Sequence, residues 1–181
     1  MNNRKKALVS AFLIWTNLIE MGLYLKHKEI VDEDMCRYIK YTPFKKVGFL
    51  ALNYLELFNK PWRSVFNYRC ARCGVSRLLK PLIKRSIDSI ELYGNIPGGL
   101  LLLHKQGCIV LANKVGKNLT VSQGVTIGKG HANSEGRDIP NIGDNVWICP
   151  NSIIFGGWIS ETMSLLGQEQ SFLTQYLIIV Q

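Results

Sequence analysis

The sequence predicts an α+β chain in which a helical N-terminal region precedes a parallel β-helix that is incomplete at its C-terminal end. Three observations support this fold class. Aliphatic residues recur at every sixth position, glycine or asparagine follows several of them, and the first half of the chain lacks this spacing. An α-helix repeats every 3.6 residues and a half-buried strand every two, so neither produces one aliphatic residue per hexad. The residues at this spacing are Leu103, Ile109, Val115, Val121, Ile127, Ile142, Ile148 and Ile154.

Residues 1–88 carry helical spacing in place of the hexads. Pro43 and Pro61 break the pattern, because proline removes a backbone donor, and Pro81 ends or kinks the last helix. The run YGNIPGG consists of turn-forming residues and separates the helices from the hexads. We therefore place the domain boundary near residue 88 and the β-helix at 89–157. The expected helices are 6–26, 31–40, 45–59 and 62–86.

The first expected helix begins with a basic cluster and continues with an apolar run. Asn17 and Glu20 interrupt this run too early for a membrane-spanning helix. Two interpretations remain: an amphipathic helix packed against a neighbouring element, or a peripheral contact with a membrane surface, which the basic flank favours. The apolar residues at helical spacing are Leu8, Phe12, Trp15, Ile19 and Leu23.

The net charge of +9 lies mainly in the first half of the chain and favours anionic partners. No nucleic-acid-binding motif accompanies it, so we expect no nucleic acid partner. The five cysteines are odd in number and irregularly spaced, which is typical of reduced thiols in the cytoplasm. Cys70 and Cys73 form a single C-x-x-C without further ligands at zinc spacing, so we expect no metal site.

The six-residue spacing is interrupted once, between Ile127 and Ile142, where nine additional residues are inserted. The insertion, residues 129–141, is polar and glycine-rich and predicts a loop that leaves the β-helix. Long loops held by a rigid scaffold are often functional. The corners between hexads carry residues that tolerate left-handed backbone angles. Three asparagines of this kind are Asn118, Asn145 and Asn151.

Three stretches carry a resemblance to a known family: GGLLLLHKQGCIV, VGKNLTVSQGVTIGKG and IPNIGDNVWICPNSII. They resemble the serine acetyltransferase family of hexapeptide-repeat acyltransferases, especially the short members associated with polysaccharide biosynthesis. WRSVFNYR resembles the arginine- and aromatic-rich helix that precedes the β-helix in those members. The resemblance implies a left-handed β-helix with three hexads per coil, a homotrimer with active sites between subunits, and acetyl-CoA as the donor.

His104 is the candidate general base. Transfer of an acetyl group from a thioester to a hydroxyl requires a base that removes the hydroxyl proton, and imidazole titrates in the useful pH range. His104 follows Leu103, an expected inward position, so its ring should point outward from the coil wall. The alternative is a surface or subunit-contact histidine. His27 and His131 lie outside the repeat and lack this setting.

The resemblance also implies a carboxylate upstream of the catalytic histidine, which would orient it. An ungapped count from His104 falls on Ser89, between two acidic residues. We predict Asp88 as the partner, with Glu91 as the alternative. Asp88 could equally cap a helix end, leaving His104 without a carboxylate.

The loop departs from the family pattern that the resemblance leads one to expect. Asp138 and Ile139 stand before Pro140, where family members carry an arginine and a histidine for the carboxylate of the amino acid. Arg137 is one residue away, and we predict that it binds an acceptor carboxylate instead. The acceptor is therefore serine or, as a rival, a sugar hydroxyl of a polysaccharide precursor.

The resemblance places the pantetheine arm of acetyl-CoA in a groove between adjacent coils. Gly128, Lys129 and Gly130 at the entrance to the loop fit this role. Glycines permit close backbone approach, and a lysine binds a phosphate as a point charge. The alternative is that these residues only build a corner and the start of a loop.

The C-terminal segment, residues 158–181, lacks hexads, and we expect a non-repeat tail with a weak helix and an apolar end. A reading frame displaced by one base can encode D-I-G-N-N-V-T-I-G-A-G-A-V-V, in which isoleucines resume the six-residue spacing. We infer that the tail is out of frame. Sequencing the gene tests this, because codons for Trp158 to Phe172 that cannot encode this string would contradict it. Loss of the last coils leaves backbone groups unpaired, so we expect reduced or absent activity.

The function that the sequence predicts is O-acetyl transfer from acetyl-CoA, with serine O-acetyltransferase, the first step of cysteine biosynthesis, as the leading form. One alternative is a sugar O-acetyltransferase of polysaccharide biosynthesis. Another is a catalytically impaired, trimeric β-helix that serves as a binding module.

Overall fold

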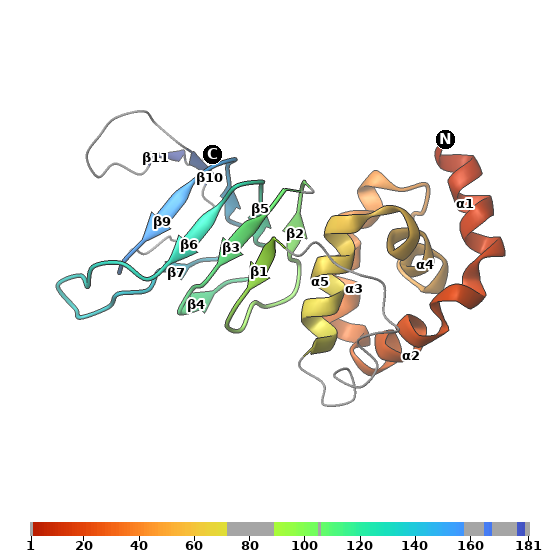
Figure 1. Cartoon of the computed structure of the whole chain (residues 1–181), viewed down its shortest axis with the longest axis horizontal. Coiled ribbons are helices and arrows are strands. Elements are labelled where there is room, and N and C mark those ends of the chain that lie inside the picture. Colours follow the sequence, from red (N-terminus) through yellow and green to blue (C-terminus); the bar gives the residue numbers. More distant parts are fainter. Residues whose placement is uncertain (1, 72–88, 105, 158–164, 168–176, 180–181) are drawn as a thin grey trace. The chain divides into compact units, whose positions relative to one another are not determined.

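The computed structural model describes residues 2–71, 89–104, 106–157, 165–167 and 177–179 (Figure 1). The chain forms two compact units, residues 1–87 and 88–181. The described part of the first unit is helical. Its elements are α1 (Asn3–Phe12), η1 (Ile14–Asn17), α2 (Leu18–Lys26), α3 (Lys28–Tyr38), η2 (Ile39–Tyr41), α4 (Phe49–Phe58) and α5 (Lys60–Ala71), where η marks a 3-10 helix.

The helix boundaries differ from the sequence prediction in three places. The expected helix 6–26 is broken after Phe12, and the segments on either side are bent by 76°. The next two expected helices have different starts, Lys28 for α3 and Phe49 for α4. Pro61 lies in the first turn of α5, where a missing backbone donor costs no intrahelical hydrogen bond. Pro81 lies outside the described residues.

Aromatic residues of α3 and α5 form the core of the helical unit. The rings of Tyr38 and Trp62 meet edge to face with centroids 5.2 Å apart, and both side chains are buried. Phe66, one turn after Trp62, is buried as well. The indole Nε1 of Trp62 donates to Glu56 Oε1 at 2.7 Å, which satisfies the polar end of a buried tryptophan. The aromatic spacing of WRSVFNYR therefore serves packing within this unit.

The packing of α1 corrects the interpretation of its apolar residues. Ser10 is the buried residue of α1, and its carbonyl accepts a hydrogen bond from Asn53 Nδ2 on α4. Asn17 Nδ2 donates to the side-chain oxygen of Asn53. A polar network therefore joins α1 to α4. The prediction that the apolar residues pack against a neighbouring element is wrong for Leu8, Phe12 and Trp15, which are exposed. It is confirmed for Leu23, which is buried.

The described strands of the second unit form three sheets of a parallel β-helix (Figure 1). All neighbouring strands are parallel except the last pair. The first sheet contains β1 (Ile90–Leu92), β3 (Cys108–Val110), β6 (Thr126–Gly128) and β9 (Ile153–Phe155). The second contains β2 (Leu101–Leu102), β5 (Thr120–Val121), β8 (Trp147–Ile148), β10 (Leu165–Gly167) and β11 (Leu177–Ile179). The third contains β4 (Lys114–Val115) and β7 (Asn141–Ile142).

The buried residues confirm the predicted six-residue spacing from Val115 onward. Leu103 and Ile109 are wrong as inward residues. Leu102 and Val110 are buried in their place and pair in register with Val121 and Ile127. The reason is a widened corner between β2 and β3, which adds residues that a strict hexad does not contain. The confirmed inward residues are Val115, Val121, Ile127, Ile142, Ile148 and Ile154.

The corners confirm the expected left-handed backbone angles. Asn118, Asn145 and Asn151 have φ values of 61°, 58° and 59°. Asn118 Nδ2 donates to Asn145 Oδ1 at 2.8 Å, so corner asparagines of successive coils stack. Gly124 (φ 68°) occupies the corner beside Asn151, where a Cβ would lie 2.2 Å from Asn151 Oδ1. The corners therefore need residues with a small or locally bonded side chain.

The described residues of the tail, 165–167 and 177–179, form strands. The expectations of a weak helix and of no further repeat are therefore wrong for these residues. β10 pairs in parallel with β8, with Leu165 opposite Trp147, a separation of eighteen residues that equals three hexads. β11 then runs antiparallel to β10. One side of the β-helix therefore gains a further rung closed by an antiparallel strand, and the remainder of the tail lies outside the described residues.

Cysteine labelling should distinguish the buried thiols Cys70 and Cys108 from the exposed thiol of Cys36. Burial raises the pKa of Cys108 to about 11, so this thiol stays protonated at mildly alkaline pH. Cys70 is buried as well, whereas Cys36 is exposed. We expect a thiol-specific reagent to modify Cys36 in the native protein and to reach Cys70 and Cys108 only after unfolding. Peptide mapping by mass spectrometry measures each site, and early modification of Cys108 would contradict the buried position.

Candidate active site

His104 lies in the widened corner that follows β2. His104 is exposed, although the inward Leu103 from which the sequence analysis derived its outward position is wrong. The corner is held against the preceding coil, because Cys108 N–H donates to Ser89 O at 3.1 Å. Gly107 makes this approach possible, since a Cβ there would lie 2.5 Å from Ser89 O. The end of the corner at Gly107 and Cys108 is therefore attached to the preceding coil, and His104 at its other end is accessible.

The carboxylate partner of His104 stays a prediction. Asp88 lies outside the described residues. Glu91, the alternative, is exposed on β1, where it pairs in register with Ile109 of β3. Its carboxylate accepts a hydrogen bond of 2.6 Å from Tyr93 Oη, and this bond raises the pKa of Tyr93. Glu91 thus already has a hydrogen-bond donor two residues away.

The inserted loop is an ordered arm. Gly130 N–H donates to Asp138 O at 2.8 Å and Asn133 N–H donates to Arg137 O at 2.7 Å, so the two sides of the arm are bonded to each other. Asn133 Nδ2 also donates to Gly157 O at 2.8 Å. The arm is therefore attached to the corner that follows β9.

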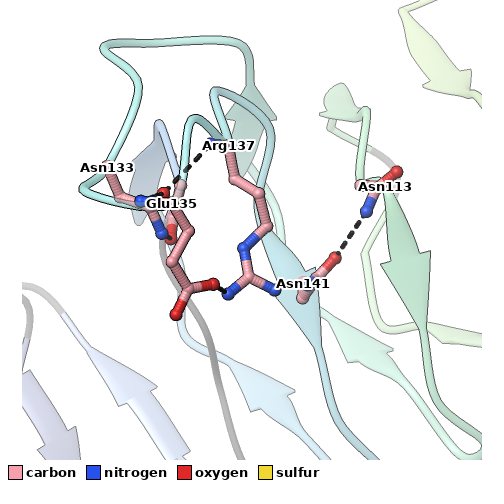
Figure 2. A network of polar contacts seen from close by, with 6 residues as sticks. Asn113, Asn133, Glu135, Arg137 and Asn141 are labelled. Carbon is pink, nitrogen blue, oxygen red and sulfur yellow. Dashed lines mark hydrogen bonds and ion pairs between the residues drawn. The ribbon is translucent and has the colours of Figure 1, made fainter.

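Arg137 has a built environment at the base of this arm (Figure 2). Its backbone N–H donates to Asn133 Oδ1 at 3.0 Å, and its Nη2 forms an ion pair with Glu135. The Nε atom is buried and has no hydrogen-bond partner among the described residues. The guanidinium therefore keeps a donor for a further acceptor, although Glu135 already occupies part of it.

A second amide pair borders this group. Asn113 Nδ2 donates to Asn141 Oδ1 at 3.0 Å, joining the segment before β4 to the first residue of β7 (Figure 2). Figure 2 shows the Arg137 side chain extending from the arm toward Asn141, with Glu135 on its other side. Arg137, which is predicted to bind the acceptor substrate, thus lies among amide and carboxylate groups. These groups can form hydrogen bonds with hydroxyl, amino or carboxylate functions.

The predicted acetyl-CoA residues lie together at the end of β6. Gly128 ends the strand and pairs in register with Phe155. Gly130 packs closely against the backbone of Gly156, because a Cβ at residue 130 would lie 2.6 Å from Gly156 N. The close approach that these glycines were predicted to allow is therefore made at Gly130 by the neighbouring coil. A role in binding acetyl-CoA stays a prediction.

Lys129 forms an ion pair with Asp138, with Nζ 2.7 Å from Oδ2. The hydrogen bond raises the pKa of Lys129 and lowers that of Asp138. Both groups are solvent-exposed, and exposed ion pairs contribute little because water and salt screen them. The ion pair thus favours the charged form of Lys129, and binding of a phosphate by Lys129 stays a prediction.

The sequence analysis missed the residues that organise the arm. Asn133 orders it through its side chain, and Glu135 and Asp138 neutralise the two cations that were predicted to bind ligands. One signal was available, since asparagine followed by a short polar run favours an Asx turn. The sequence N-S-E-G-R fits this signal, and Asn133 Oδ1 accepts the Glu135 N–H at 3.0 Å. The ion pairs had no comparable local signal.

The part of the chain that the structure describes contains no cluster of three or more His, Cys, Asp or Glu side chains able to hold a metal ion. No protein-family model matches the sequence. No curated protein matches it either.

The chain is similar in structure to solved serine acetyltransferases. The serine acetyltransferase of Neisseria gonorrhoeae in complex with serine is 17% identical, with a TM-score of 0.51, over 86% of this chain and 70% of that chain. A second structure of the same enzyme is 17% identical, with a TM-score of 0.50, over 91% of this chain and 72% of that chain. At this identity the likeness concerns the fold. The chain has the fold of the serine acetyltransferases, a helical region followed by a left-handed β-helix, which confirms the predicted fold class.

Proposed function

We propose that this protein is an O-acetyltransferase that moves an acetyl group from acetyl-CoA to a hydroxyl, with serine as the leading acceptor. The observation that carries the proposal is the exposed imidazole of His104 on a corner of a β-helix with the serine acetyltransferase fold. The ordered arm that carries Arg137 supports it, since it adds a cation and several amides to the same unit.

The proposed chemistry is direct transfer in a ternary complex. The neutral imidazole of His104 takes the proton of the acceptor hydroxyl as its oxygen attacks the thioester carbonyl. The carbon–oxygen bond forms, the tetrahedral intermediate collapses, and the carbon–sulfur bond breaks. The imidazolium returns its proton to the leaving thiolate, so the products are the O-acetyl ester and free CoA. Asp88 would stabilise the imidazolium between these two transfers.

For the acceptor we propose a zwitterionic amino acid. Arg137, whose side chain is partly exposed, would bind the carboxylate through its guanidinium once Glu135 is released, because guanidinium and carboxylate match in a bidentate geometry. Glu135, released from Arg137, would face the ammonium group of the same molecule. A sugar acceptor carries neither charge and would use the amides of Asn113 and Asn141 instead.

An acceptor screen that follows free thiol tests the proposal. The full chain is mixed with acetyl-CoA and either serine or an activated sugar, and thiol release is compared with a reaction lacking acceptor. Acceptor-dependent release supports the transferase. If none of the acceptors raises thiol release above the reaction without acceptor, the proposal is contradicted and the non-catalytic binding module is favoured. One observation favours this second candidate. Lys129 and Arg137, the cations predicted to bind ligands, are each already paired with a carboxylate of the chain.

Replacing Arg137 with alanine should raise the KM for serine by about tenfold or more, because a charge-assisted bidentate contact is lost. The KM for acetyl-CoA should stay near that of the parent. Lys129→Ala is the matched control, since it removes a cation from the same arm and should raise the KM for acetyl-CoA instead. Steady-state kinetics with each substrate varied in turn measures both. An equal effect of the two variants on both substrates would contradict the separate assignments.

We also propose a cytoplasmic homotrimer that contacts its copies through the outer face of the β1-β3-β6-β9 sheet. Ile109 and Ile153 are exposed there on either side of Thr126, and Phe155 is exposed beside them. An exposed apolar row on a regular sheet is typical of a protein contact. Analytical ultracentrifugation of the full chain and of Ile153→Glu measures the assembly. A parent that sediments as a monomer would contradict the proposal.

A further inference from the structure

α1 and η1 expose apolar side chains and bury a polar one, which is the reverse of an ordinary surface helix, and α2 exposes further apolar side chains while it buries Glu20 together with Leu23 and Tyr24. Six apolar side chains, which we term the apolar patch, face solvent, whereas the buried side chains of these elements include Ser10, Asn17 and Glu20. The exposed fractions within the patch are Leu8 73%, Val9 38%, Phe12 80%, Trp15 64%, Leu18 64% and Leu25 60%. Six largely exposed apolar side chains within eighteen residues are unusual on a soluble monomer and indicate a surface that binds something apolar.

Basic residues flank the apolar patch at both ends. Arg4 and Lys5 are exposed about two helical turns before Phe12, and Lys26 is exposed next to Leu25. The first acidic residue of the sequence is Glu20, which is buried. An apolar strip with cations at its borders and no exposed anion on α1 is complementary to a bilayer that carries anionic headgroups. Two copies of this surface would instead bring like charges together.

The packing of these helices opposes their insertion across a bilayer. No single helix in the described ranges is long and apolar enough to cross a membrane. Asn3–Phe12 and Ile14–Lys26 together have the length and composition of a span, but they are bent by 76°. The opposite faces of these helices are tied to α4 by the Ser10–Asn53–Asn17 network, and Leu23 and Tyr24 are buried. Crossing the bilayer would require breaking this packing.

We propose that the apolar patch anchors the protein peripherally to an anionic lipid surface. Phe12 and Trp15 enter the boundary between headgroups and acyl chains, as amphipathic aromatic side chains do in interfacial helices. Arg4, Lys5 and Lys26 contact the phosphates. The anchor is independent of acetyl transfer, because none of these residues belongs to the β-helix unit.

Vesicle flotation of the full chain tests the anchor. Vesicles of phosphatidylcholine with phosphatidylglycerol are compared with pure phosphatidylcholine, in low and in high salt. The chain should float with the anionic vesicles and lose binding as salt rises. The double variant Phe12→Glu/Trp15→Glu should bind about a hundredfold more weakly, because two aromatic side chains no longer leave water. Both positions are exposed, so the helical unit should keep its circular dichroism spectrum.

Tyr41→Glu is the matched control, since Tyr41 is an aromatic residue 64% exposed on η2, outside the patch. It should bind vesicles like the parent. Absence of flotation, or equal flotation of the double variant, would overturn the proposal. A double variant that only falls to a smaller assembly in sedimentation without lipid would also overturn it, because the patch would then bind a second copy.

Discussion

Replacement of His104 with alanine is expected to lower acceptor-dependent thiol release by a factor of about a hundred to ten thousand, the usual contribution of a positioned general base. The side chain is exposed in the corner after β2, so its removal should leave the fold unchanged. Without the imidazole, the acceptor hydroxyl must lose its proton to water while it attacks the thioester. The KM values should change little, because the effect falls on the chemical step.

His131→Ala is the matched control for this experiment. His131 is also an exposed histidine of the β-helix unit, but it lies in the arm, where its carbonyl accepts from Gly157 N–H. Its removal should leave thiol release within a few-fold of the parent. Equal rates for the parent and His104→Ala, at saturating acetyl-CoA and acceptor, would show that His104 is not the base. That outcome would leave the surface or subunit-contact role as its explanation.

Removal of one partner of the buried Asp34–Arg69 pair should destabilise the helical unit strongly. Arg69 Nε and Nη2 donate to the two carboxylate oxygens of Asp34 at 2.7 and 3.0 Å, which joins α3 to α5. The side chains are 0% and 3% exposed for Asp34 and Arg69. Asp34→Ala would leave a guanidinium buried without its carboxylate, a change that costs about 3–5 kcal/mol of unfolding free energy. Urea unfolding followed by circular dichroism at the helical wavelength measures it.

Two controls sharpen this prediction. Asp34→Leu/Arg69→Met removes both charges and keeps apolar volume, so it should recover most of the stability lost by Asp34→Ala. Lys28→Ala removes a partner of the exposed Lys28–Asp32 pair and should have a much smaller effect, since solvent screens that pair. A double variant as unstable as Asp34→Ala would indicate that packing, and not the unpaired charge, causes the loss.

The hexad prediction succeeded where each coil is regular and failed at one corner. Ile142, Ile148 and Ile154 are inward because the same interior position of each side of the coil recurs every six residues. In the first coil the widened corner between β2 and β3 moved the inward positions to Leu102 and Val110. Counting residues cannot reveal a corner of unusual length, because leucine occupies all of 100–103 and fits several registers equally well.

The prediction of helical spacing in the first helix was also correct, but the prediction that its apolar residues are packed against a neighbouring element was wrong. Leu8, Phe12 and Trp15 have helical spacing, yet α1 contacts α4 through Ser10 and Asn53. Spacing shows that one face of a helix is apolar. It does not show which face the rest of the chain covers, because that depends on residues more than forty positions away.

The sequence by itself determined the succession of helices and β-helical coils, the asparagine corners and the inserted arm. Each of these follows from local backbone geometry, which a periodic pattern of side chains records directly. Only the tertiary structure decided which leucine fills the first coil, that Lys129 and Arg137 are held by Asp138 and Glu135, and that α1 exposes its apolar face. These features depend on burial and on charge pairing in three dimensions, and no periodic pattern along the chain encodes them.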